Sequence, residues 1–444
     1  MFAVPTMAQN IYGSIVGTVT DATGAPMEGA AVSVSNTGTG ARQAAQTNNS
    51  GEYRLVNLVP GTYKLEIEKT GFKRLTRDNI GVQVESVIRL DSAMQIGDVS
   101  QSIEVEASAP LLQTENASLS QVVSARAVEQ LPMNGRNVMN LVGLVPGVVP
   151  QGSSEGSLTG KNVFAAGNYQ IGGGSANQSS TLFDGIPVNI TYGNVTALTP
   201  SPDAVSEFRV QTNNNTAEYG RYTGGVINMS SKGGTNQFHG TAYEFLRNKV
   251  LNATDFFANK TGAGRPAFVQ NQFGGAVGGP IRKDKTFFFF NYEGFRARQG
   301  AFFSRSVPLP EQITGNFTNW KGANGVTIPI YDPNTQTCNT PTTPTCASIG
   351  NPTIQRTQFP GNTIPASRIN PVAAKFLAFP IYARPNTAGT PNTNAFNFGK
   401  NASTGGDNDQ INLRGDHQLS DKQRLLGRFT KWTSSNLPVD VYGN

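Results

Sequence analysis

The feature that most constrains this chain is a change of character within residues 203–240. Before this stretch the sequence consists of short segments rich in glycine, serine and asparagine. After it, longer alternating segments carry aromatic residues. The stretch itself holds two short strand patterns, 206–210 and 226–230, separated by an asparagine-rich loop and a Gly224-Gly225 pair. The chain is therefore predicted to pass from a compact domain into a sheet of another kind.

The order of residues here resembles one family. The pattern E-F-R-V, followed by A-E-Y-G-R-Y-T-G-G-V-I-N-M-S-S-K-G-G-T-N-Q-F-H-G, is similar to the end of the plug domain of TonB-dependent outer-membrane receptors. Residues 182–188 (LFDGIPV) resemble the hairpin that precedes this segment in the family. The resemblance covers almost the whole chain and is closest to the Oar-like subgroup. It implies a mainly β protein with an N-terminal β-sandwich, an α+β plug domain and the first strands of a transmembrane antiparallel β-barrel.

Composition fits turn-rich β structure, because the 444 residues include 49 glycines and 26 prolines and only 14% are charged. No run of about 20 apolar residues predicts a transmembrane helix. A membrane barrel needs only alternating strands of about ten residues, which give a weaker signal. The net charge of +6 is spread along the chain without a basic cluster interleaved with aromatics. Nucleic acid is therefore not an expected partner.

Residues 11–94 predict a small all-β domain. Strands are expected at 15–20, 31–35, 53–56, 63–68 and 82–90. The clearest alternation places Tyr63, Leu65 and Ile67 on one face. This segment resembles the carboxypeptidase regulatory-like domain, a transthyretin-like sandwich that is often grouped with carbohydrate-binding-like folds. Nothing in it builds a sugar site, because Tyr53 and Tyr63 are expected in the core.

Two short segments flank this domain. Residues 1–10 resemble the end of a signal peptide, and an ordinary chain end is the alternative. Residues 95–110 form a predicted linker that contains Ile103, Glu104, Val105, Glu106 and Ala107. Their position resembles that of the TonB box, an extended segment that would add a strand to the edge of a sheet in TonB. The alternatives are a last strand of the sandwich and a plain linker.

Residues 111–234 match the plug of the resembling family. Short helices are predicted at 125–131 and 138–145, ended by Pro132 and Pro146. Residues 235–444 are expected to form an incomplete N-terminal part of the barrel, with five to seven strands and one long loop over 300–406. Strands are predicted at the following ranges: 237–247, 269–279, 286–295, 409–418 and 424–432. The short supply of strands indicates that the sequence is an N-terminal fragment, because an open sheet edge cannot sit in lipid.

The segment 286–295 (TFFFFNYEGF) places Phe288, Phe290 and Tyr292 on one side. Phe287 and Phe289 share the other side. Aromatic residues in such a strand suit a membrane interface. Alternation does not identify the side that meets lipid, so both assignments stay open.

No motif predicts enzyme chemistry, a catalytic residue, a metal site or a cofactor. His239 and His417 lack the spacing of metal ligands, and no G-x-S-x-G sequence is present. Cys338 and Cys346 lie eight positions apart in a loop segment and could form a disulfide in an oxidising compartment.

The resemblance implies energy-coupled uptake through a plugged barrel in the outer membrane of a Gram-negative type cell. The plug and N-terminal domain would face the periplasm, and the barrel would contact outer-membrane lipid. TonB would be the periplasmic partner, and the extracellular ligand could be an oligosaccharide, a peptide or a siderophore. The alternative is a secreted or surface adhesion protein built of β-sandwich domains, with carbohydrate binding as one option.

Overall fold

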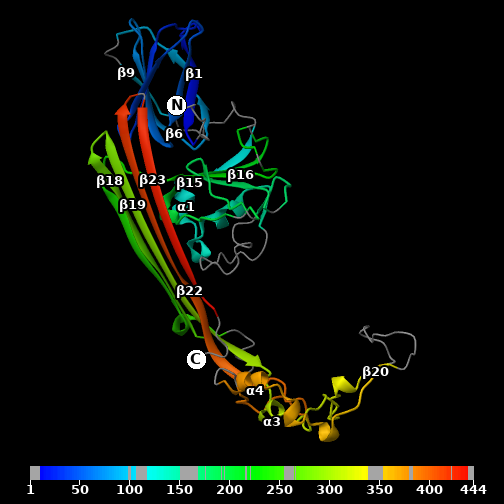
Figure 1. The fold of residues 1–444 in the computed structure, drawn as a ribbon. Coiled ribbons are helices and arrows are strands. Elements are labelled where there is room, and N and C mark those ends of the chain that lie inside the picture. Colours follow the sequence, from blue (N-terminus) through cyan, green and yellow to red (C-terminus); the bar gives the residue numbers. More distant parts are fainter. Residues whose placement is uncertain are drawn as a thin grey trace, which may run out of the picture. The chain divides into compact units, whose positions relative to one another are not determined.

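The computed structural model describes most of the chain. The described ranges are 11–98, 102–106, 118–150, 169–175, 177–191, 193–194, 196–215, 218–220, 222–254, 265, 267–338, 354–379, 384–421 and 423–438. The chain forms two compact units (Figure 1). The first comprises 1–247, 270–297 and 406–436, and the second comprises 248–269, 298–405 and 437–444. Residues 1–10, which resemble the end of a signal peptide, lie outside the described ranges.

The N-terminal domain is a sandwich of two sheets. One sheet has the order β4-β1-β7, with β8 also paired to β1, and the other has the order β3-β2-β5-β6-β9. Their bounds are β1 Gly13–Asp21, β2 Ala31–Asn36, β3 Arg42–Gln46, β4 Glu52–Leu58, β5 Gly61–Glu68, β6 Arg74–Val82, β7 Val87–Arg89, β8 Ser92–Met94 and β9 Ser102–Glu106. The predicted sandwich is thus present.

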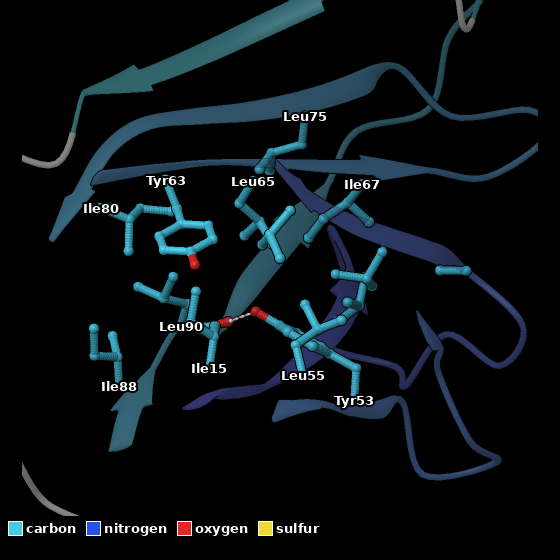
Figure 2. Close-up of a cluster of buried hydrophobic side chains, with 14 of the residues drawn as sticks. Ile15, Tyr53, Leu55, Tyr63, Leu65, Ile67, Leu75, Ile80, Ile88 and Leu90 are labelled. Carbon is cyan, nitrogen blue, oxygen red and sulfur yellow. Dashed lines mark hydrogen bonds between the residues drawn. The ribbon is translucent and has the colours of Figure 1, made fainter. Parts of the chain in front are cut away.

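Alternate residues of these strands fill one apolar core. Tyr63, Leu65 and Ile67 of β5 all point into it, as their alternation predicts, and Figure 2 shows them against side chains of the facing sheet. Tyr53 lies in the core as well, and its hydroxyl donates to the backbone oxygen of Leu90 at 2.8 Å. Burying an aliphatic side chain such as Leu65 or Ile67 stabilises the domain by about 1.5–3 kcal/mol. Both tyrosines are core residues, as expected.

The strand predicted over 82–90 is wrong in one respect, because a turn interrupts it. β6 ends at Val82 and β7 begins at Val87. Between them Glu85 has φ = 53°, a left-handed conformation that no strand contains. The apolar alternation continues across the turn, with Val84 and Ile88 both buried, so sequence pattern alone does not reveal it.

The plug domain contains a five-stranded sheet of order β10-β15-β16-β13-β14 and a separate pair, β11 and β12. Helix α1 is N-capped by Ser124 and contacts β15. The predicted helix at 138–145 is a 3-10 helix, η2. The elements are β10 Leu119–Val123, α1 Ala125–Gln130, η1 Asn134–Arg136, η2 Val138–Leu144, β11 Val148–Pro150, β12 Tyr169–Ile171, β13 Ser180–Phe183, β14 Ile186–Pro187, η3 Pro202–Ala204, β15 Val205–Asn213 and β16 Val226–Ser231.

Beyond the plug, five strands form what we call the barrel sheet. Its order is β17-β18-β19-β22-β23, and these strands are the longest arrows in Figure 1. The bounds are β17 His239–Asn248, β18 Phe268–Arg282, β19 Thr286–Arg305, β22 Phe398–Ser420 and β23 Gln423–Leu437. Each contains most of a predicted strand, and all but β17 are longer than predicted. The described residues thus give five of the five to seven strands expected.

A close backbone approach occurs where the plug domain leads into the barrel sheet. A Cβ at Gly234 would lie 2.5 Å from the carbonyl oxygen of Phe288 and 2.6 Å from that of Gly279. Real Cβ atoms do not come so near, and therefore only glycine fits at this position without a backbone shift.

The second unit includes the long segment between β19 and β22. Its described elements are short: η4 Lys249–Leu251, α3 Pro310–Ile313, η5 Pro333–Thr335, β20 Thr337–Cys338, β21 Ile354–Gln355, η6 Pro360–Asn362, η7 Ala366–Arg368 and α4 Pro371–Ala378. The buried Asn362 side chain joins two parts of this segment by donating to the carbonyl oxygens of Phe317 and Ile328 at 2.8 and 3.0 Å. Within the described ranges, no helix is long and apolar enough to cross a membrane.

Candidate functional site: the contact between plug and barrel sheet

The barrel sheet turns a polar face toward the plug domain. Side chains two positions apart point to the same face of a strand, and on β22 this face carries polar residues. All of them are buried: Asn408, Gln410, Asn412, Arg414 and Asp416. Buried polar groups need hydrogen-bond partners, and the plug domain supplies many of them. Three groups of contacts result.

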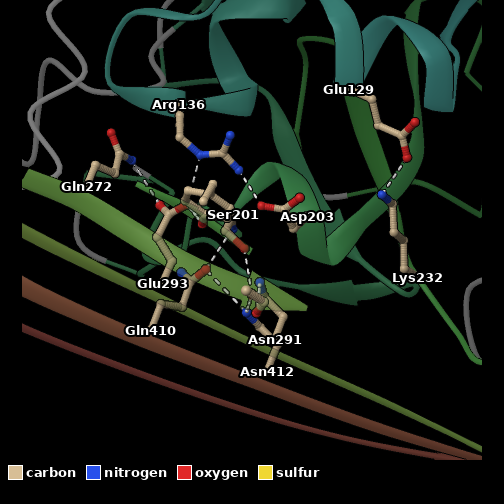
Figure 3. A network of polar contacts seen from close by, with 12 residues as sticks. Glu129, Arg136, Ser201, Asp203, Lys232, Gln272, Asn291, Glu293, Gln410 and Asn412 are labelled. Carbon is tan, nitrogen blue, oxygen red and sulfur yellow. Dashed lines mark hydrogen bonds and ion pairs between the residues drawn. The ribbon is translucent and has the colours of Figure 1, made fainter. Parts of the chain in front are cut away.

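The first group is centred on Glu293 of β19. Arg136 of the plug forms an ion pair with this carboxylate at 3.1 Å, and Tyr243 and Gln272 donate to it at 2.6 and 3.1 Å. Arg136 also pairs with Asp203 of the plug (Figure 3). Its guanidinium lies 4.1 Å from the centre of the Tyr243 ring, within the range of a cation–π contact. Arg136 of the plug therefore bridges a carboxylate of the barrel sheet, Glu293, and a carboxylate of the plug, Asp203.

The backbone that carries Arg136 has an unusual conformation. Gly135 and Arg136 have φ values of 68° and 52°, both in the left-handed region. For arginine this costs on the order of 1 kcal/mol, and such outliers persist only where surrounding contacts hold them. The carbonyl oxygen of Gly135 accepts from Gln272 at 3.3 Å, which helps to fix the turn against β18.

The second group consists of neutral amides and a hydroxyl. The Ser201 amide donates to the Gln410 side chain at 2.6 Å, and its hydroxyl donates to Asn291 at 2.7 Å. Gln410 in turn donates to the carbonyl oxygen of Thr199 at 2.9 Å. Asn412 donates to Asn291 at 3.0 Å, and this completes the network in Figure 3.

The third group holds the hairpin turn between β13 and β14 and the end of β16. Asp184 forms an ion pair with Arg428 of β23 at 2.8 Å and accepts from the amide of Ser231 at 2.8 Å. Arg414 donates to the Ser231 hydroxyl at 2.9 Å and forms an ion pair with Asp416 at 2.8 Å. Each charge in this group therefore has an opposite charge within contact distance, as buried ions require.

The candidate residues from the sequence lie elsewhere. Ile103, Glu104, Val105 and Glu106 belong to β9, which pairs in parallel with β6 at the end of its sheet, and Ala107 lies outside the described residues. Cys338 lies in β20, whereas Cys346 falls outside the described residues, so the disulfide stays a prediction. No group of three or more metal-ligating side chains occurs among the residues that the structure describes.

No sequence pattern predicted the residues of the contact between plug and barrel sheet. Asp184 belongs to the LFDGIPV segment, but neither its partner nor its role follows from that motif. A usable signal exists for Glu293, because it is the one acidic residue in the aromatic segment 286–295. A single carboxylate in a barrel strand indicates a lumen-facing position with a partner.

Comparisons with known protein families agree with this architecture. Residues 14–95 match the carboxypeptidase regulatory-like domain, residues 113–226 the TonB-dependent receptor plug domain, and residues 230–443 an outer membrane beta barrel domain. The fold therefore defines an outer-membrane β-barrel protein with a plug, preceded by a sandwich domain. The predicted fold class and the outer-membrane location in a Gram-negative type envelope are confirmed.

By the order of its three matched domains the chain is similar to the TonB-dependent outer-membrane receptors, a family of receptors and transporters. It is 26% identical over 303 residues to the TonB-dependent transporter Oar of Myxococcus xanthus, which covers 64% of this chain. The chain spans 27% of the length of that relative.

Solved structures show more distant similarity. The siderophore receptor PirA from Acinetobacter baumannii aligns with 73% of this chain and 33% of its own, at 17% identity and a TM-score of 0.37. A putative carbohydrate binding protein from Bacteroides uniformis aligns with 18% of this chain and 40% of its own, at 25% identity and a TM-score of 0.17. Both TM-scores are too low to support an inference about this chain.

Proposed function

We propose that this chain forms the gate of a TonB-dependent transporter, in which the plug domain closes the barrel and shifts during energy-coupled uptake. The observation that carries the proposal is the composition of the contact between plug and barrel sheet. All three groups of contacts contain hydrogen bonds, and the first and third also contain ion pairs. By contrast, the interior of the plug domain is an apolar cluster.

This difference allows the plug to move without unfolding. A hydrogen bond contributes about 0.5–1.5 kcal/mol net, because water replaces either partner when the bond breaks. The apolar cluster has no such substitute, since exposing it to water costs about 25 cal/mol per Å². A pulling force on the plug therefore breaks its polar contacts with the barrel sheet before it disrupts the apolar interior of the plug.

The energy source in this proposal is TonB, and the segment that binds it is β9. As the last strand of its sheet, β9 has one backbone edge paired with β6 and one edge without a strand neighbour among the described elements. Strand addition to that edge needs main-chain hydrogen bonds and little side-chain identity. The residues are those predicted from sequence, Ile103 to Ala107. The transported ligand stays open between oligosaccharide, peptide and siderophore.

Site-specific photocrosslinking tests the partner. A photoreactive amino acid at Ile103 of the receptor, expressed in a Gram-negative outer membrane, should crosslink to TonB. The same residue at the exposed Glu52, on the other sheet of the sandwich, should not. Val105→Pro should abolish the crosslink at equal surface expression, because proline removes a backbone donor, and Val105→Thr should retain it. Equal crosslinking at positions 103 and 52 contradicts the proposal.

A second measurement tests the gate. A receptor carrying Arg136→Ala, Ser201→Ala and Asp184→Asn together loses a member of each contact group. Cells expressing it should become sensitive to vancomycin, which an intact outer membrane excludes. Unchanged resistance, with the receptor present at the surface in normal amount, would show that these contacts do not hold the plug closed.

A further inference from the structure

The turn that interrupts the predicted strand at 82–90 makes an unusual contact. It comprises Gln83, Val84, Glu85 and Ser86, and we call it the acidic turn. The Ser86 hydroxyl donates to the carbonyl oxygen of Gln83 at 2.8 Å and accepts from its amide at 3.0 Å. These two bonds close the turn, and the left-handed backbone of Glu85 directs its side chain outward.

The plug sheet binds the carboxylate of Glu85 with three donors. Gln211 of β15, Asn228 of β16 and Tyr219 of the loop between them each donate to it. Tyr219 and Asn228 belong to the E-Y-G and V-I-N parts of the motif that indicated the plug, a motif that the proposed gate does not use. The acidic turn gives them a role.

The backbone of the acidic turn is bound as well. Arg209 donates to the carbonyl oxygen of Val84 at 3.2 Å and to that of Glu85. Glu207 accepts from the amide of Val84 at 2.5 Å. Two adjacent strands therefore recognise both the side chain and the main chain of one short turn, which random contact between two surfaces does not produce.

The donors on the plug side are built for a partner. Arg209, Gln211 and Asn228 are 1%, 3% and 0% exposed with the acidic turn in place, so in the docked state the turn supplies the acceptors for their donors. The side-chain oxygens of Gln211 and Asn228 have no hydrogen-bond partner among the described residues, and both amides direct their NH₂ groups to Glu85. Only an acidic or carbonyl-rich group satisfies such a set.

Burial acts on the two carboxyl groups in the same direction. It raises the pKa of Glu85, although Tyr219, Asn228 and the charge of Arg209 oppose the shift. It raises the pKa of Glu207 to about 7 against the Val84 amide and Arg209. Both groups lie in the contact rather than in solvent, which agrees with a junction that stays closed.

We propose that the acidic turn is a docking peg and that the plug sheet carries its socket, so that the N-terminal domain is held on the plug. The consequence concerns β9. β6 runs directly into the acidic turn, and its first five residues, 74–78, pair with β9. The strand proposed to bind TonB is therefore presented by a domain that is fixed to the plug. Only this last step rests on the proposed function.

Spin-label distance measurements on the receptor in liposomes test the docking. Labels at Ser50 and Ala125, both exposed, report on the N-terminal domain and the plug. Cys338 and Cys346 are replaced by serine in all variants. The wild type should give one narrow distance distribution. Glu85→Ala should lose it, and Glu28→Ala, at an exposed glutamate of the same domain, should keep it.

Two variants on the socket side protect the result against misfolding of the turn. Asn228→Asp replaces a donor by a like charge and should abolish the narrow peak, whereas Tyr219→Phe removes one hydroxyl and should weaken it. A broad distribution in the wild type, or a narrow one in both Glu85→Ala and Asn228→Asp, overturns the docking. The crosslink from position 103 to TonB is measured separately. A broad spin-label distribution together with a crosslink refutes only the docking of the acidic turn. A narrow distribution without a crosslink refutes only the proposal that TonB binds β9.

Discussion

The core of the N-terminal sandwich and the contact between plug and barrel sheet are both buried, but they consist of opposite kinds of side chains. The sandwich core is made of aliphatic residues, two methionines and two tyrosines. The plug contact is made of carboxylates, guanidinium groups and amides, such as Glu293, Arg136 and Gln410. Burial alone therefore does not tell which contacts in this molecule stay formed when the plug moves. The chemistry of the buried groups does, because water replaces a hydrogen bond but not an apolar contact.

The largest effect is expected in the sandwich core. Leu65→Ala removes a fully buried side chain and should lower the free energy of unfolding of the domain by about 2–5 kcal/mol. Val56→Ala, at a residue that is 38% exposed in the same domain, should cost far less. Thermal unfolding of the receptor, followed by tyrosine fluorescence, measures both. Equal shifts for the two variants would contradict the assignment of a dry core.

The next effect separates the two faces of β19. Phe287 and Phe289 are 5% and 3% exposed on the plug side, whereas Phe290 is 37% exposed on the other side, which meets lipid in a barrel. Phe290→Arg should therefore cost about 2–4 kcal/mol if the position is at mid-depth, and impair assembly into the membrane. Phe289→Arg should leave membrane insertion intact and disturb plug contacts instead. Equal loss of outer-membrane assembly would refute this assignment of faces.

A smaller effect is expected in the plug contact. Arg136→Ala leaves Glu293 without its cation and should weaken the hold on the plug by about 1–3 kcal/mol. Adding Glu293→Gln should recover part of the loss, because the charge is then gone as well. The urea concentration at which the plug becomes sensitive to protease measures the effect. Lys232→Ala is the control, since the ion pair of Lys232 with Glu129 is partly exposed and should contribute less than about 1 kcal/mol. A double variant whose effect equals the sum of those of Arg136→Ala and Glu293→Gln would disprove coupling between the two residues.

The smallest effect concerns pH at the acidic turn. Burial raises the pKa of Glu207 to about 7 in the docked state, above its ordinary value of about 4.5. A raised pKa of an acid favours docking at low pH and weakens it as pH rises through 7. The charged neighbours are Arg209 and Glu85, and burial raises the pKa of Glu85 as well. The narrow spin-label peak should decrease from pH 5 to pH 8, and less so in Glu207→Gln; a steeper decrease in that variant would reverse the sign.

Much of the fold could be predicted from the sequence, because strand alternation is a local signal. The pattern of Tyr63, Leu65 and Ile67 placed β5 and its buried face correctly. Alternation also separated Phe288 and Phe290 from Phe287 and Phe289. It could not say which pair lies inward, because a period of two carries no absolute direction.

The contact residues escaped prediction for a different reason. Arg136 and Glu293 are 157 positions apart, and no local pattern relates them. The acidic turn was hidden by its own neighbours, since Val82, Val84 and Ile88 continue the apolar alternation on both sides of it. Family resemblance gave the order of the domains, whereas the pairings between them depend on tertiary structure.

The missing Cβ at Gly234 also bears on how such receptors can recombine. The carbonyl oxygens of Gly279 and Phe288 occupy the space that any other residue would need. A gene fusion that joins this plug to the barrel of another receptor therefore requires compatible residues at the junction. The crossover point has to bring Gly234 together with the β18–β19 hairpin, or the incoming hairpin has to leave the same gap.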